Sequence, residues 1–96
     1  MKFTWDPKKA SKVLAEHRVK FEKITDIFAD TLSLDLIDKK HSSPGDIRFI
    51  IVGITAEYGL VHLIYTMPRD DEIHFITARK ADRWHANQYE ENVRRT

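Results

Sequence analysis

Three strand-like runs follow one another between residues 47 and 78 with only short turns between them, and this succession constrains the fold most. The run IRFIIVGIT (47–55) is almost continuously apolar and β-branched, which is typical of a strand buried on both faces. LVHLIYTM (60–67) and EIHFITA (72–78) follow the turns EYG and PRDD. Turns this short join antiparallel neighbours, so we predict a meander in which these strands pair in chain order.

Helical patterns flank this block. Residues 5–17, WDPKKASKVLAEH, begin with Asp6 as an N-cap and Pro7 in the first turn, and they predict a helix. Residues 19–30 predict a second, shorter helix. LSLDLID (32–38) predicts a fourth strand, followed by a loop over residues 39–46, and residues 79–95 predict a closing helix. The expected fold class is α+β, with two N-terminal helices, a four-stranded mainly antiparallel sheet and a C-terminal helix. The apolar face of the second helix would comprise Phe21, Ile24, Ile27 and Phe28.

Length and composition set the broad class. Ninety-six residues allow one core, so we treat residues 1–96 as a single domain. The absence of Cys excludes disulfides and thiolate metal sites. No apolar run approaches the roughly 18 residues of a membrane span, and MKFTWDPKKA lacks the apolar stretch of a signal peptide. We therefore expect a soluble, cytoplasmic protein with no membrane partner.

Several kinds of chemistry are disfavoured by the motifs that are missing. The five His residues show no H-x-H or H-E-x-x-H spacing, so we predict no metal site and no cofactor. There is no G-x-S-x-G motif and no Cys nucleophile, which argues against the common hydrolytic triads. Three dispersed glycines do not make a phosphate-cradling loop.

Cations on or beside strands remain as candidates for chemistry. Arg48 lies in a strand, Arg69 in a turn, and Arg79 and Lys80 close the last strand. An Arg fork binds phosphate bidentately and stabilises the extra charge of a pentacovalent transition state, which suits RNA cleavage. The plain alternatives are an ion pair between Arg48 and Asp46, and two solvated cations at a strand–helix junction.

Two histidines and two aromatic residues could complete such a site. His62 and His74 lie on neighbouring predicted strands, where they could transfer protons or simply pack across the sheet. Alternation places His74 with Glu72, Ile76 and Ala78 on one face, and Ile73, Phe75 and Thr77 on the other. Trp84 and Tyr89 could stack on RNA bases, although packing in the core is the favoured role for either ring alone.

Taken together, these segments resemble a known family. The stretches FTWDPKKASKVLAEHRVKFEKITDIFAD, DKKHSSPGDIRFIIVGIT, LIYTM and IHFITARKADRWHANQYEE are similar to the BrnT family, and the likeness covers roughly residues 3–91. Its most specific pieces are Trp5-Asp6-Pro7, His17 before Val19, and Ala78-Arg79-Lys80-Ala81 followed by Tyr89. BrnT proteins are ribonuclease toxins of type II toxin–antitoxin systems, with a fold similar to RelE-type toxins.

The resemblance implies an activity and partners. The activity would be metal-independent endoribonuclease cleavage that inhibits translation. The partner would be a BrnA-like antitoxin with a ribbon-helix-helix DNA-binding part, so that DNA contact comes only through the complex. A heterotetramer with the antitoxin is one arrangement that the resemblance allows.

Site residues carry over from the family's pattern one by one. Arg48, with Asp46 where Glu is usual, matches the acid-x-Arg element, and His41 and Ser42 match the loop before it. Arg79 matches the Arg of the S-A-R element, and His74 stands where the family usually has Arg on the last strand. His74 can act as acid or base but cannot reproduce an Arg fork. The catalytic residues implied are Arg48, Arg69, His74, Arg79 and Tyr89, with Lys80, Trp84 and His62 as RNA-binding residues.

Two other functions remain open on this evidence. The replacement at His74 is compatible with a catalytically weakened homologue that only binds the antitoxin and regulates the operon. The basic ends of the chain are compatible with nucleic-acid binding without cleavage, although the net charge of +1 argues against this option.

Overall fold

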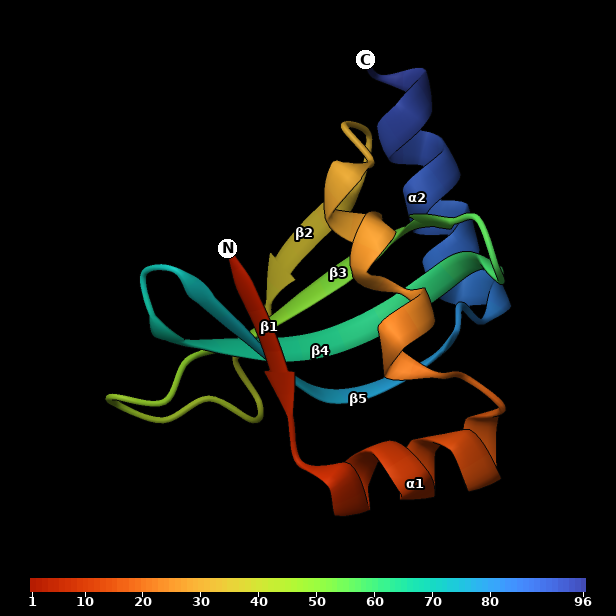
Figure 1. Cartoon of the computed structure of the whole chain (residues 1–96). Coiled ribbons are helices and arrows are strands. Elements are labelled where there is room, and N and C mark those ends of the chain that lie inside the picture. Colours follow the sequence, from red (N-terminus) through yellow and green to blue (C-terminus); the bar gives the residue numbers. More distant parts are fainter.

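The computed structural model describes residues 1–96 as a five-stranded sheet with helices on both of its faces (Figure 1). The strand order is β1-β5-β4-β3-β2. Strands β2 to β5 pair antiparallel in chain order, as predicted, whereas β1 pairs parallel with β5. The strands are β1 (Lys2–Trp5), β2 (Leu34–Ile37), β3 (Arg48–Thr55), β4 (Gly59–Arg69) and β5 (Glu72–Lys80).

The prediction of four strands was wrong by one, because β1 lies where only a helix start was expected. Its four residues, KFTW, alternate polar and apolar, a short period-2 signal that the prediction overlooked. They form a strand because β5 offers a free edge: Phe3 pairs with Ile73 and Trp5 with Phe75, and both aromatic rings pack on the core. The pairing also makes β5 an interior strand rather than an edge.

The first helix, α1 (Pro7–His17), begins as predicted. Asp6 is its N-cap and accepts a hydrogen bond from the Lys8 amide, and Pro7 occupies the first turn. The helix ends at Arg18, which adopts the left-handed conformation with φ 60°. The helix packs against β5, where Val13 is buried.

The second predicted helix was wrong, since residues 19–30 form two short 3₁₀ helices, η1 (Phe21–Lys23) and η2 (Thr25–Ala29). The buried side chains of Phe21, Ile24 and Ile27 recur every third residue. A 3₁₀ helix with three residues per turn places all three on one side, towards the sheet. Figure 1 shows these orange segments covering one face, here called the front face.

The closing helix, α2 (Arg83–Arg94), begins later than predicted. Strand β5 continues through Lys80, and Asp82 then caps the helix by accepting a hydrogen bond from the His85 amide. The helix lies behind the sheet next to β3 and β2 (Figure 1). It covers part of the opposite face, here called the rear face. None of the helices in the protein is long and apolar enough to cross a bilayer.

A bulge in β5 decides which residues reach the rear face. Ile64 pairs with Thr77, but the next residue, Tyr65, pairs with Phe75, so that Ile76 is an extra residue. The predicted alternation therefore fails beyond Phe75. Ala78 is buried in the front-face core, whereas Thr77 and Arg79 lie on the rear face.

The turn predicted at residues 68–71 is shorter than expected. Strand β4 extends through Pro68 to Arg69, with a second register shift between Thr66 and Arg69. Pro68 is tolerated there because a bulge frees its position from the hydrogen-bond ladder.

Candidate active site

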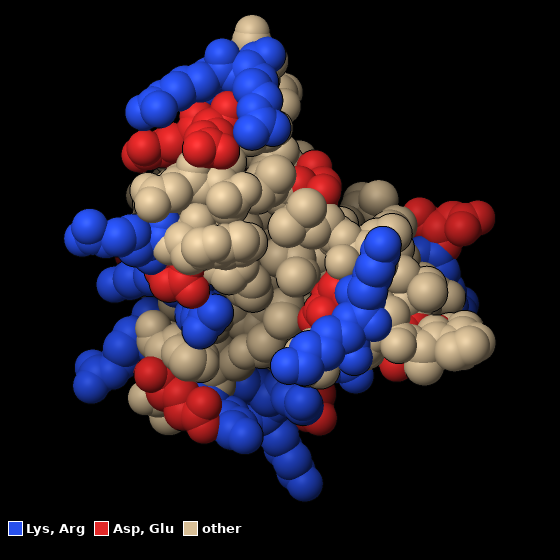
Figure 2. All heavy atoms as spheres, turned by 180° about the vertical axis from the view of Figure 1, so that it is seen from behind, with Lys and Arg blue, Asp and Glu red and all other residues tan.

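The rear face carries two adjoining hollows between α1, the loop 38–47 and strands β3 to β5. The first, here called the Arg48 end, has a volume of about 320 Å³, and the second, the Arg79 end, about 170 Å³. Ile64 and Thr77 line both hollows, so they form one groove. Figure 2 looks onto this side and shows uncharged atoms in the middle of the face, with Lys and Arg side chains and several Asp and Glu side chains around it. The Arg48 end is lined by Lys9, Lys12, Val13, Glu16, Asp38, His41, Arg48, Ile64, Ile76 and Thr77.

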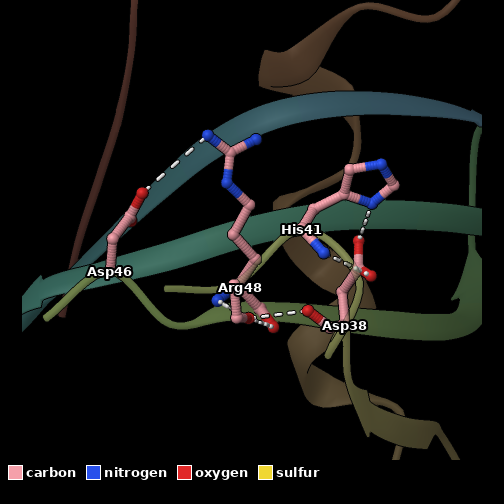
Figure 3. Close-up of polar contacts among 5 residues, drawn as sticks. Asp38, His41, Asp46 and Arg48 are labelled. Carbon is pink, nitrogen blue, oxygen red and sulfur yellow. Dashed lines mark hydrogen bonds and ion pairs between the residues drawn. The ribbon is translucent and has the colours of Figure 1, made fainter. Parts of the chain in front are cut away.

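Asp38 and His41 form a hydrogen-bonded pair at the Arg48 end (Figure 3). The His41 Nδ1 atom lies 2.8 Å from Asp38 Oδ2, and the imidazole is largely exposed to the groove. Burial raises the pKa of Asp38, but the hydrogen bonds from the His41 ring and amide outweigh it and lower the pKa overall. An ionised Asp38 therefore orients the imidazole.

The loop that carries this pair is fixed to β3. The Asp38 amide donates to the Arg48 carbonyl at 2.8 Å, and the Arg48 amide donates to Ser42 Oγ at 2.9 Å. Ser42 Oγ in turn donates to the Asp38 carbonyl at 2.6 Å. These hydrogen bonds fix the position of the His41 loop relative to Arg48 on β3.

Arg48 reaches across β4 with donors to spare (Figure 3). Its Nη2 atom lies 3.9 Å from Asp46 Oδ2, at the outer limit of an ion pair, and its Nε atom is buried without a hydrogen-bond partner. A buried donor that lacks a partner is costly, so a bound anion would relieve that cost. The predicted ion pair with Asp46 exists, but it leaves most of the guanidinium free.

The Arg79 end is built differently. Arg79 Nη2 lies 3.4 Å from Asp82 Oδ2, and His85 Nδ1 lies 2.9 Å from Asp82 Oδ1. His62 is buried at 6% exposure, with its ring centre 4.4 Å from that of His85. Burial, and then the charges of His85 and Arg79, lower the pKa of His62 to about 4, so this ring is neutral near pH 7.

His74 lies on the rear face near Arg48. Arg48, Thr66 and His74 are successive partners across β3, β4 and β5. His74 Nδ1 lies 2.8 Å from Thr4 Oγ1, and the Thr4 hydroxyl donates its proton to Glu72 at 2.7 Å. The structure thus places Arg48, His62, His74 and Arg79 on one face of the sheet.

Four other predicted site residues lie elsewhere. Arg69 is exposed at the end of β4, and Trp84 is 61% exposed on α2. Lys80 projects from β5 over the Tyr58 ring, 5.9 Å from its centre, so it is not on the rear face. Tyr89 is buried, and its hydroxyl donates to Asp30 at 2.8 Å, which ties α2 to η2.

Sequence reasoning missed Asp38 and the lysines of α1. The spacing D-x-x-H in the loop was the available signal for the pair, since an Asx-type turn brings residues three apart together. Lys9 and Lys12 fall one turn apart on α1, but only the packing of α1 against β5 directs them towards the groove. No group of three or more His, Cys, Asp or Glu side chains is arranged to bind a metal ion.

Comparison of the structure with solved structures defines the class of fold. The crystal structure of the Brucella abortus ribonuclease toxin BrnT superposes with a TM-score of 0.70 at 19% sequence identity, covering 86% of this chain and 99% of that one. At this identity the likeness shows the fold alone: an α+β protein with a mixed five-stranded sheet. Comparison with curated protein sequences gave no match.

The sequence itself identifies the family. Residues 5–85 match the family described as "Ribonuclease toxin, BrnT, of type II toxin-antitoxin system". The chain therefore belongs to the BrnT family of ribonuclease toxins, as its motifs predicted, and membership implies an antitoxin partner.

Proposed function

We propose that this chain is a metal-independent endoribonuclease that cleaves RNA in the rear-face groove and thereby inhibits translation. One observation carries the proposal: an Asp38-oriented imidazole and a loosely paired guanidinium share one hollow with Lys9 and Lys12. RNA cleavage needs a proton acceptor, a proton donor and positive charge at one phosphate. The Arg48 end supplies the acceptor and the positive charge, and His74, which does not line the hollow, lies on the same sheet face two strands from Arg48.

His41 is the proposed general base. Neutral His41 takes the proton of a ribose 2′-hydroxyl, and the 2′-oxygen attacks the adjacent phosphorus. Arg48 binds the phosphate oxygens and stabilises the negative charge of the pentacovalent transition state. The bond from phosphorus to the 5′-oxygen breaks, which leaves a 2′,3′-cyclic phosphate and a 5′-hydroxyl.

His74 is the proposed acid that protonates the leaving 5′-oxygen. It shares a cross-strand row with Arg48, and its Nδ1 is held by Thr4. The Thr4 contact fixes the ring and leaves the second ring nitrogen for proton transfer. In this arrangement His replaces the family's usual Arg as a proton donor instead of a phosphate fork.

The partner of this proposed toxin is a BrnA-like antitoxin. Family membership supports an antitoxin in general, and neutralisation would follow from covering the groove. Contact with DNA would come through the antitoxin in the complex.

Expression of the protein without an antitoxin tests the proposal. Induction of the wild-type protein should stop growth and fragment RNA. With His41→Gln or Arg48→Gln, cells should grow normally and their RNA should stay intact. Arg95→Gln is the matched control, because Arg95 pairs with Glu91 at 3.3 Å on the far end of α2. Purified protein should keep its activity in excess chelator. Normal growth with intact RNA at confirmed soluble wild-type expression would instead favour a non-enzymatic, antitoxin-binding homologue.

A further inference from the structure

The two arginines of the groove project from backbone rows at opposite ends of the rear face. Arg48 pairs with Thr66 at one end of the sheet, and Val52 pairs with His62, which pairs with Arg79, at the other. These rows are four residues apart along β3, which is about 13 Å at about 3.3 Å per residue. Each guanidinium is also paired with an acid at its own end of the groove, Asp46 or Asp82.

The floor of the groove between the two arginines is uncharged, while Glu16 of α1 lines the wall beside it. Ile64 and Thr77 form the middle row of the rear face and line both hollows. A strand laid along the groove would therefore meet positive charge at each end and an apolar or hydroxyl surface in between. Because each guanidinium is tied to an acid at its own end, this arrangement suits separate phosphates of one polyanion.

The Arg79 end has no hydrogen-bonded Asp–His pair that lines the hollow. His62 is buried, and its pKa of about 4 keeps it neutral. His85 is the other candidate, but its ring packs edge-on against His62 and Trp84, and it does not line the hollow. His17 does line the hollow. Its ring lies 3.8 Å from the Glu16 carboxylate, a looser contact than the 2.8 Å between His41 and Asp38. Arg79 remains as the permanent charge of this end.

We propose that the Arg79 end is a subsite for a phosphate that flanks the scissile one, so that the substrate is an RNA strand of several nucleotides. This inference rests on the proposed cleavage at the Arg48 end. A stacked strand advances about 3.4 Å per nucleotide, so 13 Å corresponds to about four nucleotides, and to fewer in an extended strand. Arg79 is then a binding residue that determines substrate length, not a residue of the chemical step.

Chimeric oligonucleotides test this division of roles. Each contains one ribonucleotide in a deoxy strand, so that only one bond has the 2′-hydroxyl needed for cleavage, and the strand is lengthened stepwise on either side from two to eight nucleotides. The value of kcat/KM should rise tenfold to a hundredfold at the length that reaches Arg79, the range expected for a hydrogen bond to a charged group. Arg79→Gln should remove this rise by raising KM while leaving kcat for the dinucleotide within twofold.

Two further substitutions make the test specific. An uncharged methylphosphonate at the flanking position should reproduce the effect of Arg79→Gln, and the two changes together should cost no more than either alone. Arg95→Gln, an exposed arginine paired with Glu91, should leave the length dependence intact. A loss of kcat on the dinucleotide in Arg79→Gln, or equal rates at all lengths in wild type, would overturn the subsite.

Binding measurements separate this inference from the proposed activity. With 2′-O-methyl strands that cannot be cleaved, fluorescence anisotropy should show the same gain in affinity with length and the same loss in Arg79→Gln. The slope of log affinity against log salt should also fall by about 0.7, the value for one phosphate on a single strand. If no RNA is cleaved but this binding pattern appears, the proposed catalysis fails and the phosphate subsite stands. If RNA is cleaved and affinity does not depend on Arg79, only the subsite fails.

Discussion

Replacing Tyr89 by Phe separates a structural role of this residue from a catalytic one. The Tyr89 hydroxyl donates to Asp30 Oδ2 at 2.8 Å, and Asp30 also accepts from the Ile54 and Leu32 amides at 2.9 Å each. Burial and this bond raise the pKa of Tyr89 to about 12, so the phenol stays protonated near pH 7 and is a poor base. We therefore expect Tyr89→Phe to affect stability and not chemistry.

The magnitude follows from what the substitution removes. A hydrogen bond to a charged acceptor contributes about 1.5–3 kcal/mol, but Asp30 keeps its two amide partners and is partly exposed to water. We expect Tyr89→Phe to lower the free energy of unfolding by about 1–2 kcal/mol. For a domain of this size that corresponds to a drop in Tm of roughly 5–15 °C.

Denaturant unfolding and single-turnover cleavage together provide the assay. The rate per folded molecule should stay within twofold of wild type. In an Asp30→Ala background the same Tyr89→Phe change should cost less than about 0.5 kcal/mol, because its partner is already gone. A hundredfold loss of cleavage at unchanged Tm would refute this reasoning and return Tyr89 to the chemical step.

Three further predictions follow from the same structure. Because the pKa of His62 is about 4 in the folded protein, the unfolded chain binds a proton below about pH 6.5 that the folded chain does not. The free energy of unfolding should therefore fall by about 2–3 kcal/mol between pH 6.5 and 4. Urea titrations should show a flatter decline in His62→Gln. A Cβ at Gly53 would lie 2.9 Å from the buried Ile27 side chain, so Gly53→Ala should cost about 1–3 kcal/mol, and an unchanged urea midpoint would contradict the packing. Asp38→Asn should lower kcat on the order of 100-fold with little change in KM, and a wild-type rate would show that His41 needs no orientation.

Local signals predicted those parts of the fold that neighbouring residues decide. Asp6 and Pro7 begin α1 as expected, because an N-cap and a first-turn proline act within a few residues. The strands β3 to β5 and their pairing order follow from apolar runs and short turns. Phe21, Ile24 and Ile27 are buried as predicted and Phe28 is partly buried, although the spacing of three belongs to 3₁₀ helices and not to an α-helix.

The candidate site was only partly accessible from the sequence. Arg48 was identified by its residue type and by resemblance. The structure places it in a hollow, with only a long ion pair to Asp46. The Asp38–His41 pair went unrecognised because its only signal was the short D-x-x-H spacing, and a loop has no period to predict its shape. The two lysines of α1 could not be assigned, since which part of a charged helix faces a groove depends on how the helix packs.

The sequence by itself determined the family, the α+β class and the identity of the cations, because motifs, periodicity and residue chemistry are local properties. Only the tertiary structure decided which of those cations share a surface. The extra residue Ile76 in β5 reverses the alternation, so that Arg79 lies on the same face as Arg48 while Lys80 lies on the other. A bulge is set by pairing between strands distant in the chain, and no pattern within β5 alone reports it.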